Sequence, residues 1–250
     1  MLRFLCCCCF SDENSSNERQ PLLQPRPPQV NGAESARQGR PAVSDEQTVK
    51  RIGRLVMRRV CLPELDRRFA DVAETFNEQQ ERYEAMVRHI RNLQQSYDCT
   101  RCGSLAFAEC VRKIREEHKS THRVSLKIKG YGFSLSVVPV GSEGESEEEP
   151  LPPRLKSAQN ELKSTSESAK AAISKGTTLQ ELIGWLLRSH DQIAEQVKGA
   201  AATYQEQGRL NENLEENMRE VKRAKELSQE YRQRAQEVLT EAAQIAGAHL

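Results

Sequence analysis

The stretch "PELDRRFADVAETFNEQQERYEAMVRHIRNLQQSY", residues 63–97, decides the fold. Its larger side chains recur at alternating steps of three and four residues, which is the spacing of one helix face. Pro63 suits the first turn of a helix, where no backbone N–H is needed. A long helix is therefore predicted over 64–97, with Gln79 as the polar member of an otherwise apolar seam. The seam consists of Leu65, Phe69, Val72, Phe76, Tyr83, Met86, Ile90 and Leu93.

A seam of this kind has to be covered by another helix. Its heptad spacing is typical of a coiled coil, in which the partner helix comes from the same chain or from a second one. Large aromatic residues at several seam positions favour a bundle over a two-stranded zipper. The seam thus predicts either an intramolecular bundle or an assembly surface, through self-association or helical protein partners.

Downstream of the seam the periodicity changes. A shorter helix is predicted from about Ser104 to His118, and the segment 123–140 then alternates apolar and polar residues with a period of two. Gly130 and Gly132 lie between the two alternating runs and favour a tight turn. The pattern predicts a β-hairpin, which has to pack on a helix or on another sheet because an isolated hairpin is marginally stable in water.

The segment "GSEGESEEEPLPP", residues 141–153, has the composition of an acidic linker. It divides the chain into a region at 44–140 and a C-terminal helical or coiled-coil region at 154–250. Within the latter, Gly176 is expected to end a first helix. Thr178 and Glu181 form a capping-box pattern for a second, long helix, and Gly208 is expected to bend or break it.

Upstream of the seam, residues 45–61 resemble an amphipathic helix that begins with a capping-box pattern at Ser44 and Gln47. It is either a helix that lies on an anionic membrane or one that docks on its neighbours. The cations of its basic surface are Lys50, Arg51, Arg54, Arg58 and Arg59.

Composition limits the function classes. The formal net charge of +1 provides no overall attraction to nucleic acid, and only 37% of the residues are hydrophobic. There is no phosphate-binding glycine loop, nucleophile elbow or clustered acid–base set. We therefore expect a mainly α protein of long helices and one small hairpin, with no catalytic site, cofactor, small-molecule substrate or nucleic-acid partner.

Four consecutive cysteines, Cys6, Cys7, Cys8 and Cys9, lie between apolar residues near the start of the sequence. So short a backbone cannot easily arrange adjacent thiols around one metal ion, and no small-residue cleavage site follows as in a signal peptide. The residue after the initiator Met is Leu2, which excludes N-myristoylation. S-palmitoylation fits best, with residues 1–10 as the anchor and 11–43 as a disordered tether.

The tether also contains a short sorting pattern. Glu18, Leu22 and Leu23 match an acidic dileucine signal, in which two aliphatic side chains bind a pocket on a sorting adaptor.

Residues 6–34, "CCCCFSDENSSNERQPLLQP…VNGAE", resemble the N-terminal anchor of the lipidated scaffold subunit of Ragulator. That anchor also combines cysteines, an acidic Ser/Asn tract, a dileucine and an Asn-Gly-Ala-Glu stretch. The resemblance implies a late-endosomal or lysosomal membrane location. It departs at Leu2, where that family carries a myristoylated glycine. The remainder of the chain resembles generic coiled-coil subunits of trafficking complexes in architecture alone.

Another set of residues approaches the spacing of a zinc finger: Cys99, Cys102, His118 and His122. The predicted hairpin follows the histidines instead of holding the cysteine pair, so a helix–helix turn with incidental thiols is the preferred interpretation.

Taken with the anchor, these features predict a palmitoylated adaptor on the cytoplasmic face of endosomal, lysosomal or related vesicle membranes, and not a secreted protein. The alternatives are a small zinc-binding regulatory or nucleic-acid-binding protein, and a SNARE-like tethering helper built on the C-terminal helix.

Overall fold

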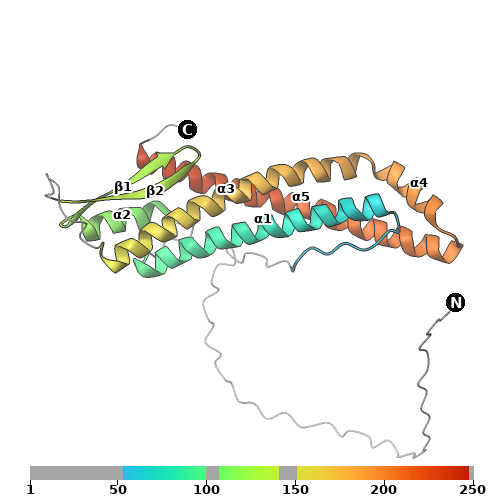
Figure 1. Cartoon of the computed structure of the whole chain (residues 1–250), viewed down its shortest axis with the longest axis horizontal. Coiled ribbons are helices and arrows are strands. Elements are labelled where there is room, and N and C mark those ends of the chain that lie inside the picture. Colours follow the sequence, from blue (N-terminus) through green and yellow to red (C-terminus); the bar gives the residue numbers. More distant parts are fainter. Residues whose placement is uncertain (1–52, 100–106, 141–150, 248–250) are drawn as a thin grey trace, which may run out of the picture. The chain divides into compact units, whose positions relative to one another are not determined.

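The computed structural model describes residues 53–99, 107–140 and 151–247 (Figure 1). The elements in chain order are α1 (Pro63–Ser96), α2 (Phe107–His118), β1 (His122–Lys129), β2 (Gly132–Pro139), α3 (Pro153–Arg188), α4 (His190–Ala200) and α5 (Tyr204–Ala246). The prediction of a mainly α protein with one hairpin is confirmed. The predicted anchor, the tether and most of the acidic linker lie outside the described residues.

Three long helices, α1, α3 and α5, lie side by side and form the core (Figure 1). The α1 seam is buried within this single chain, with Phe69, Val72, Met86 and Ile90 fully covered. Its partners are therefore α3 and α5 of the same chain. Residues Lys50–Leu250 form one unit, so helices on both sides of the acidic segment share one core. The principal side chains that α3 and α5 contribute are Leu155, Leu162, Leu179, Ile183, Leu214 and Val221.

Gln79 lies at the centre of this bundle and is completely buried. Its side-chain amide donates hydrogen bonds to the carbonyl oxygens of Ala172 in α3 and Ser228 in α5, both at 3.2 Å. A buried amide is tolerated when it is hydrogen-bonded. The polar seam position thus joins all three long helices.

The predicted end of a helix at Gly176 is wrong, because α3 runs through it without interruption. A Cβ atom at Gly176 would lie 2.4 Å from both Gln79 Nε2 and Arg232 Cδ. The glycine is therefore needed where α3 approaches α1 and α5 closely, and it does not end the helix. Thr178 lies inside α3, where its hydroxyl donates to the Ser174 carbonyl oxygen (3.4 Å) instead of capping a new helix.

The actual interruptions come later in the chain. A break at Ser189 separates α3 from α4, and residues 201–203 separate α4 from α5. The side chain of Thr203 accepts a hydrogen bond from the Glu206 backbone N–H (3.2 Å) and caps α5. Gly208 lies within α5, so the predicted break there is also wrong.

The hairpin is confirmed, with β1 and β2 paired antiparallel. Gly130 adopts a left-handed φ of 58° in the turn, which glycine accepts without a steric penalty. Two side chains of α3 bind the edge of β2. Ser166 Oγ accepts from the Phe133 N–H (2.9 Å), and Gln159 Nε2 donates to the Leu135 carbonyl oxygen (3.1 Å).

Residues 53–62 form no helix: the chain runs extended over 53–60 and turns at Cys61, whose φ is 61°, so the predicted helix over 45–61 is wrong in its described part. We call this segment the strap. Its backbone is bound by side chains of the bundle: Leu55 exchanges two hydrogen bonds with the side-chain amide of Asn77 in α1 (2.7 and 3.0 Å), and Arg58 does the same with Asn217 in α5 (2.8 and 2.7 Å). These bonds replace those that a helix would make within itself.

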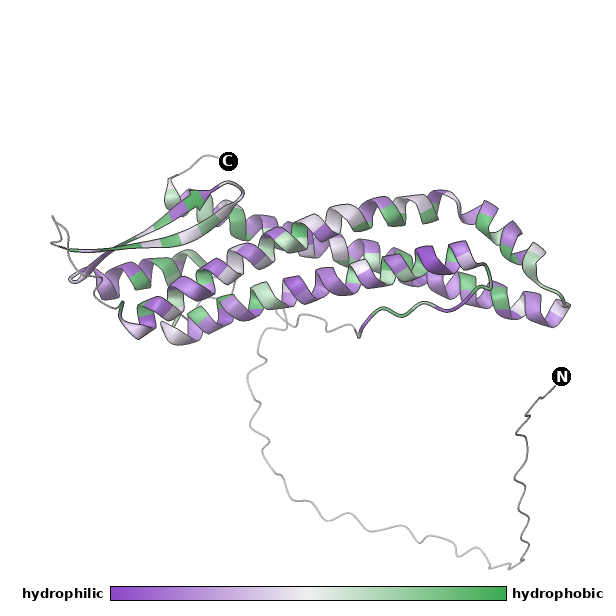
Figure 2. Ribbon diagram, viewed as in Figure 1, coloured by the Kyte–Doolittle hydropathy of each residue, from purple (hydrophilic) through white to green (hydrophobic). Residues whose placement is uncertain are grey.

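No described helix combines the length and apolarity required to cross a bilayer. Polar and apolar residues are intermixed along each long helix (Figure 2).

Candidate functional site

The predicted basic helix does not form a continuous helical surface. Arg54, Arg58 and Arg59 lie on the extended strap, whereas Lys50 and Arg51 are outside the described residues. The Arg58 guanidinium pairs with Glu216 of α5 at 2.9 Å. This cation therefore helps to attach the strap to the bundle and does not belong to a helix that lies flat on a membrane.

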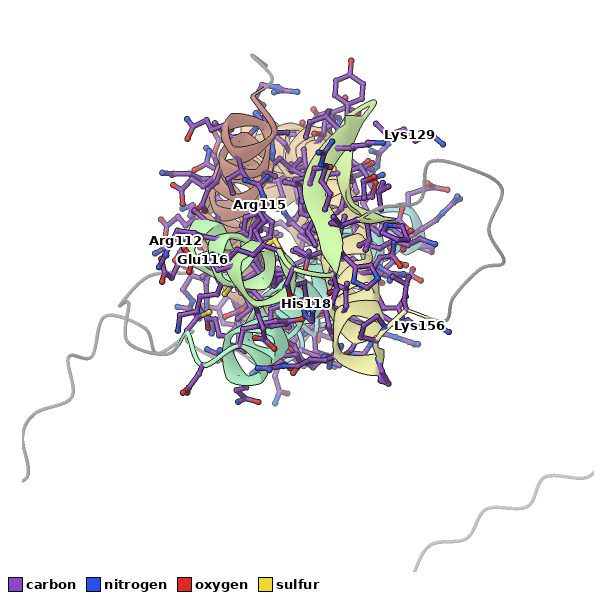
Figure 3. All side chains as sticks on the ribbon, turned by 90° about the vertical axis from the view of Figure 1, so that its left-hand side faces the viewer. Arg112, Arg115, Glu116, His118, Lys129 and Lys156 are labelled. Carbon is purple, nitrogen blue, oxygen red and sulfur yellow. The ribbon has the colours of Figure 1, made fainter. Side chains whose placement is uncertain are left out.

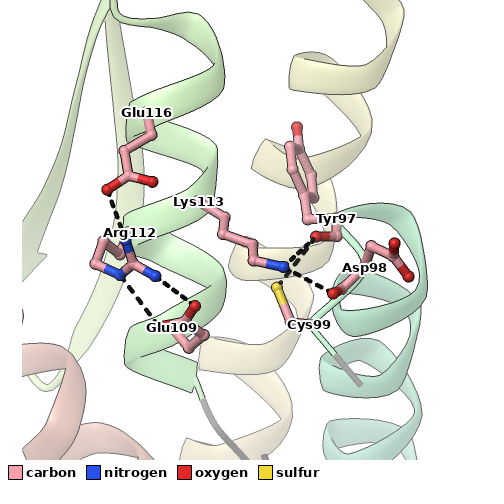
Figure 4. A network of polar contacts seen from close by, with 7 residues as sticks. All are labelled: Tyr97, Asp98, Cys99, Glu109, Arg112, Lys113 and Glu116. Atoms are coloured by element: carbon pink, nitrogen blue, oxygen red, sulfur yellow. Dashed lines mark hydrogen bonds and ion pairs between the residues drawn. The ribbon is translucent and has the colours of Figure 1, made fainter. Parts of the chain in front are cut away.

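The residues of the predicted zinc set are not brought together within the described part of the chain. No group of three or more His, Cys, Asp or Glu side chains that could hold a metal ion occurs there, and Cys102 is not described. Cys99 Sγ instead contacts the Tyr97 carbonyl oxygen at 3.4 Å, and Lys113 binds the carbonyl oxygens of Tyr97 and Asp98 (Figure 4).

Cys99 and Cys110 are both buried where α2 meets the end of α1. Burial, together with a hydrogen bond to Cys99, raises the pKa of the Cys110 thiol above its ordinary value. The neutral thiol, which is a poor nucleophile and a poor metal ligand, is thereby favoured. Both thiols thus act as small core residues that pack the two helices together.

The Tyr97 side chain connects α1, α2 and α3. Burial, reinforced by the Glu117 carboxylate and opposed by the Arg154 guanidinium, raises the pKa of Tyr97 to about 12. The guanidinium of Arg154 lies 4.5 Å from the centre of the Tyr97 ring, and it is also ion-paired with Glu117. With its phenol protonated at neutral pH and its cation already paired, this cluster is structural.

A groove between α3 and α5 is the best candidate for a binding surface. It contains a pocket of about 230 Å³ and a second one of about 220 Å³, and Leu187 and Arg188 line both. Leu187, which is half-buried and lines both pockets, is the main apolar residue of the lining, whereas Ile183 and Met218 are almost fully buried beneath it. We call this the basic groove because its lining includes Arg188, His190, Lys222, Lys225 and Arg232, whereas Asp191 is its acidic member.

One end of the basic groove has unused hydrogen-bonding capacity. Arg232 Nη1 donates to Gln180 Oε1 at 2.6 Å, but the buried Arg232 Nε has no partner among the described residues. Gln79 Oε1 is also buried without a partner among the described residues. The Gln79 and Arg232 side chains both lie against Gly176. Unpaired buried polar atoms are costly, so these atoms mark a place that is built less for stability than the rest of the core.

No family model, curated protein or solved structure matches this chain.

The basic groove was not predicted from the sequence. Its two walls come from residues 176–191 and residues 218–232. Most of α4 and the first part of α5 separate these two ranges in the sequence. Only the packing of α3 against α5 brings them together, and no local spacing indicates that packing.

Proposed function

We propose that this protein is a peripheral membrane adaptor, held by palmitate on Cys6, Cys7, Cys8 and Cys9 to the cytoplasmic face of endosomal, lysosomal or related vesicle membranes. The observation that carries the proposal is the run of four cysteines between Phe4-Leu5 and Phe10. One acyl chain gives reversible membrane binding, and two or more give stable anchoring.

The length of chain between the cysteines and the bundle is compatible with a membrane-anchored adaptor. About 40 residues separate Cys9 from the strap, and fully extended they would span at most roughly 140 Å. The bundle can thus reach partners well beyond the lipid headgroups while it stays attached. Anchoring in this way raises the effective concentration of a bound partner at the membrane, which is how an adaptor acts.

The surface that recruits a partner has to differ from the α1 seam, because the bundle itself covers that seam. The basic groove combines the partly exposed Leu187 with an excess of cations, which complements an amphipathic helix with acidic residues along its edges. We assign partner binding to this groove. The SNARE-like alternative is less well supported, since the apolar side of α5 packs on α1 and α3.

The anchor is tested by replacing Cys6–Cys9 with Ser in the full chain and following its localisation and its labelling with a palmitate analogue. We expect loss of label and a diffuse distribution. Cys61→Ser, at an exposed cysteine outside the cluster, is the control and should change neither. A quadruple variant that remained on the same membranes would refute the anchoring proposal.

The same experiment has a second arm for the groove. Lys222→Glu with Lys225→Glu should keep the membrane location and remove a defined subset of the neighbours found by proximity labelling. Arg219→Glu with Arg234→Glu is the matched control, because these are exposed cations of α5 that do not line the groove. Identical sets of neighbours for both variants would refute the role of the groove.

A further inference from the structure

The outer face of the hairpin is rich in cations. Along β1, the buried residues Val124 and Leu126 face the core, and the residues between and beside them face outward. The exposed outward-facing residues of β1 are Arg123, Lys127 and Lys129. Their cross-strand neighbours on β2 are Val138, Ser134 and Gly132. No Asp or Glu occurs between residues 118 and 140, so the hairpin contributes no carboxylate to this face.

The α3 helix extends this basic face. Gln159 and Ser166 form the line along α3 that binds β2. On one side of this line, facing the core, lie the buried residues Leu155, Leu162 and Ala169. The opposite flank of α3 therefore lies beside the outer face of the hairpin. Exposed lysines occupy it at intervals of seven residues, at Lys156, Lys163 and Lys170.

Two observations support this placement. A Cβ atom at Gly132 would lie 3.0 Å from Lys170 Nζ, so this lysine reaches the tip of the hairpin. In the end view, Lys129 of the hairpin and Lys156 of α3 lie on the same side, away from Arg112 and Glu116 of α2 (Figure 3). We call Arg123, Lys127, Lys129, Lys156, Lys163 and Lys170 the hairpin patch.

The charges of the hairpin patch are not neutralised by ion pairs within the described residues. Elsewhere on this end of the bundle, the Arg112 and Arg154 guanidiniums pair with carboxylates. None of the patch cations does so. Glu167, which is exposed between Lys163 and Lys170 along α3, is the carboxylate of this flank. The patch therefore keeps a net positive charge.

Large apolar side chains are exposed beside these cations. Tyr131, in the turn between the strands, is 87% exposed, and Val138 and Val140 are 48% and 59% exposed. Tyrosine is enriched at membrane interfaces, where its ring enters the headgroup region and its hydroxyl remains hydrated. Cations together with such side chains form the combination that attracts peripheral proteins to anionic lipid.

We propose that the hairpin patch and Tyr131 bind an anionic phospholipid surface and form a second membrane contact in addition to the acylated cysteines. This inference rests on the proposed adaptor function. Val138 and Val140 are exposed beside the cations of the patch, and such aliphatic side chains suit a lipid surface better than a nucleic acid. The contact would hold the side of the bundle that carries the hairpin and the first half of α3 at the bilayer.

The test uses the full-length, unacylated protein produced in bacteria and sedimented with vesicles at 0.1 M salt. We expect binding to vesicles that contain phosphatidylserine and not to vesicles of phosphatidylcholine alone. Each cation near an anionic surface contributes roughly a fivefold increase in partitioning. The triple variant Arg123→Gln, Lys127→Gln, Lys129→Gln should therefore bind about 100-fold more weakly. Raising the salt to 0.5 M should weaken binding of the unmodified chain, because the Debye length falls.

The matched control is Lys198→Gln, Arg219→Gln, Arg234→Gln, which removes the same charge from exposed positions on α4 and α5. We expect this variant to bind like the unmodified protein. All substitutions are at exposed positions, and an unchanged circular dichroism spectrum verifies the fold. Equal weakening by both variants would show that net charge alone acts, which overturns the proposal. So would patch-dependent binding to single-stranded RNA without binding to anionic vesicles.

A separate readout follows the hairpin itself. In a Trp185→Phe background, Tyr131→Trp places the only tryptophan in the hairpin turn, since the chain has one natural tryptophan. Its emission should shift to shorter wavelength on anionic vesicles and be quenched by brominated lipid. An unchanged spectrum with vesicle-bound protein would exclude the hairpin as the contact. Neither vesicle assay depends on acylation, so failure of the cysteine anchor in cells and failure of the hairpin contact are distinguishable.

Discussion

Asn77 and Asn217 hold the strap through their side-chain amides. Each amide donates to a backbone carbonyl and accepts from the backbone N–H of the same strap residue, as a neighbouring β-strand would. The strap can therefore remain extended without unpaired backbone groups at Leu55 and Arg58. Leu55 and Val60 are buried against the bundle as a result, whereas Val56 is 77% exposed. Tertiary hydrogen bonds thus override the helical spacing of this segment.

Replacing Asn217 with Ala should lower the free energy of unfolding by roughly 1–3 kcal/mol, because the N–H and carbonyl groups of Arg58 lose their partners. Asn213→Ala is the matched control. The Asn213 amide donates a single, exposed hydrogen bond to the Arg59 carbonyl oxygen (2.8 Å), so its loss should cost at most about 1 kcal/mol. Urea unfolding measures both values. If the two variants were equally stable, the two-bond attachment of the strap would not contribute as described.

At the scale of the elements, α3 continues through Gly176. The effect of a glycine on a helix depends on its surroundings. In an exposed helix interior it weakens the helix relative to alanine. At a helix crossing it lets another element approach, and at Gly176 the approaching side chains are Gln79 and Arg232. Packing of α3 against α1 and α5 outweighs the weak helix propensity at that position. The helix ends instead at Ser189, the C-cap residue, whose backbone N–H donates to the Trp185 carbonyl oxygen.

Gly176→Ala should destabilise the protein by roughly 1–3 kcal/mol, because the added methyl overpacks the three-helix crossing. Gly208→Ala should have the opposite sign. No atom lies within 4 Å of a Cβ at Gly208, so alanine there should raise the free energy of unfolding by about 0.5–1 kcal/mol through helix propensity. Thermal and urea unfolding of the two variants provide the comparison. A stabilising Gly176→Ala substitution would mean that the crossing has room for a methyl group and that the 2.4 Å approach of Gln79 and Arg232 is not maintained.

At the scale of the whole molecule, α1 shares its core with helices that follow the acidic segment. Phe76 of α1 is 1% exposed, and its ring centroid lies 6.2 Å from that of Tyr231 in α5. Residues so far apart in sequence can be buried against each other only if both regions fold together. Residues Lys50–Leu250 should therefore unfold in one cooperative transition.

Phe76→Ala should lower the free energy of unfolding by roughly 3–5 kcal/mol and weaken all helices together. Helical content followed at 222 nm and tyrosine signals in the near-ultraviolet should then give the same midpoint. Tyr204→Ala is the aromatic control, because Tyr204 is 92% exposed and its truncation should change stability by less than about 0.5 kcal/mol. Two separate transitions would instead indicate independent regions on either side of residues 141–153.

By itself, the sequence determined the elements whose signal is local. The three- and four-residue steps of the α1 seam and the period-two runs of the hairpin appear in the structure as predicted, because each element must bury one face and its pattern records which face that is. The cysteine anchor is likewise a prediction from local sequence and lies outside the described residues.

Only the tertiary structure decided which elements pack against one another. It covered the α1 seam within the chain, kept α3 continuous at Gly176 and made the strap extended through asparagine side chains. It also assembled the basic groove from α3, α4 and α5, and the hairpin patch from β1 and α3. The physical reason is that these features depend on contacts between residues far apart in sequence, where packing and hydrogen bonds to other elements outweigh local propensity.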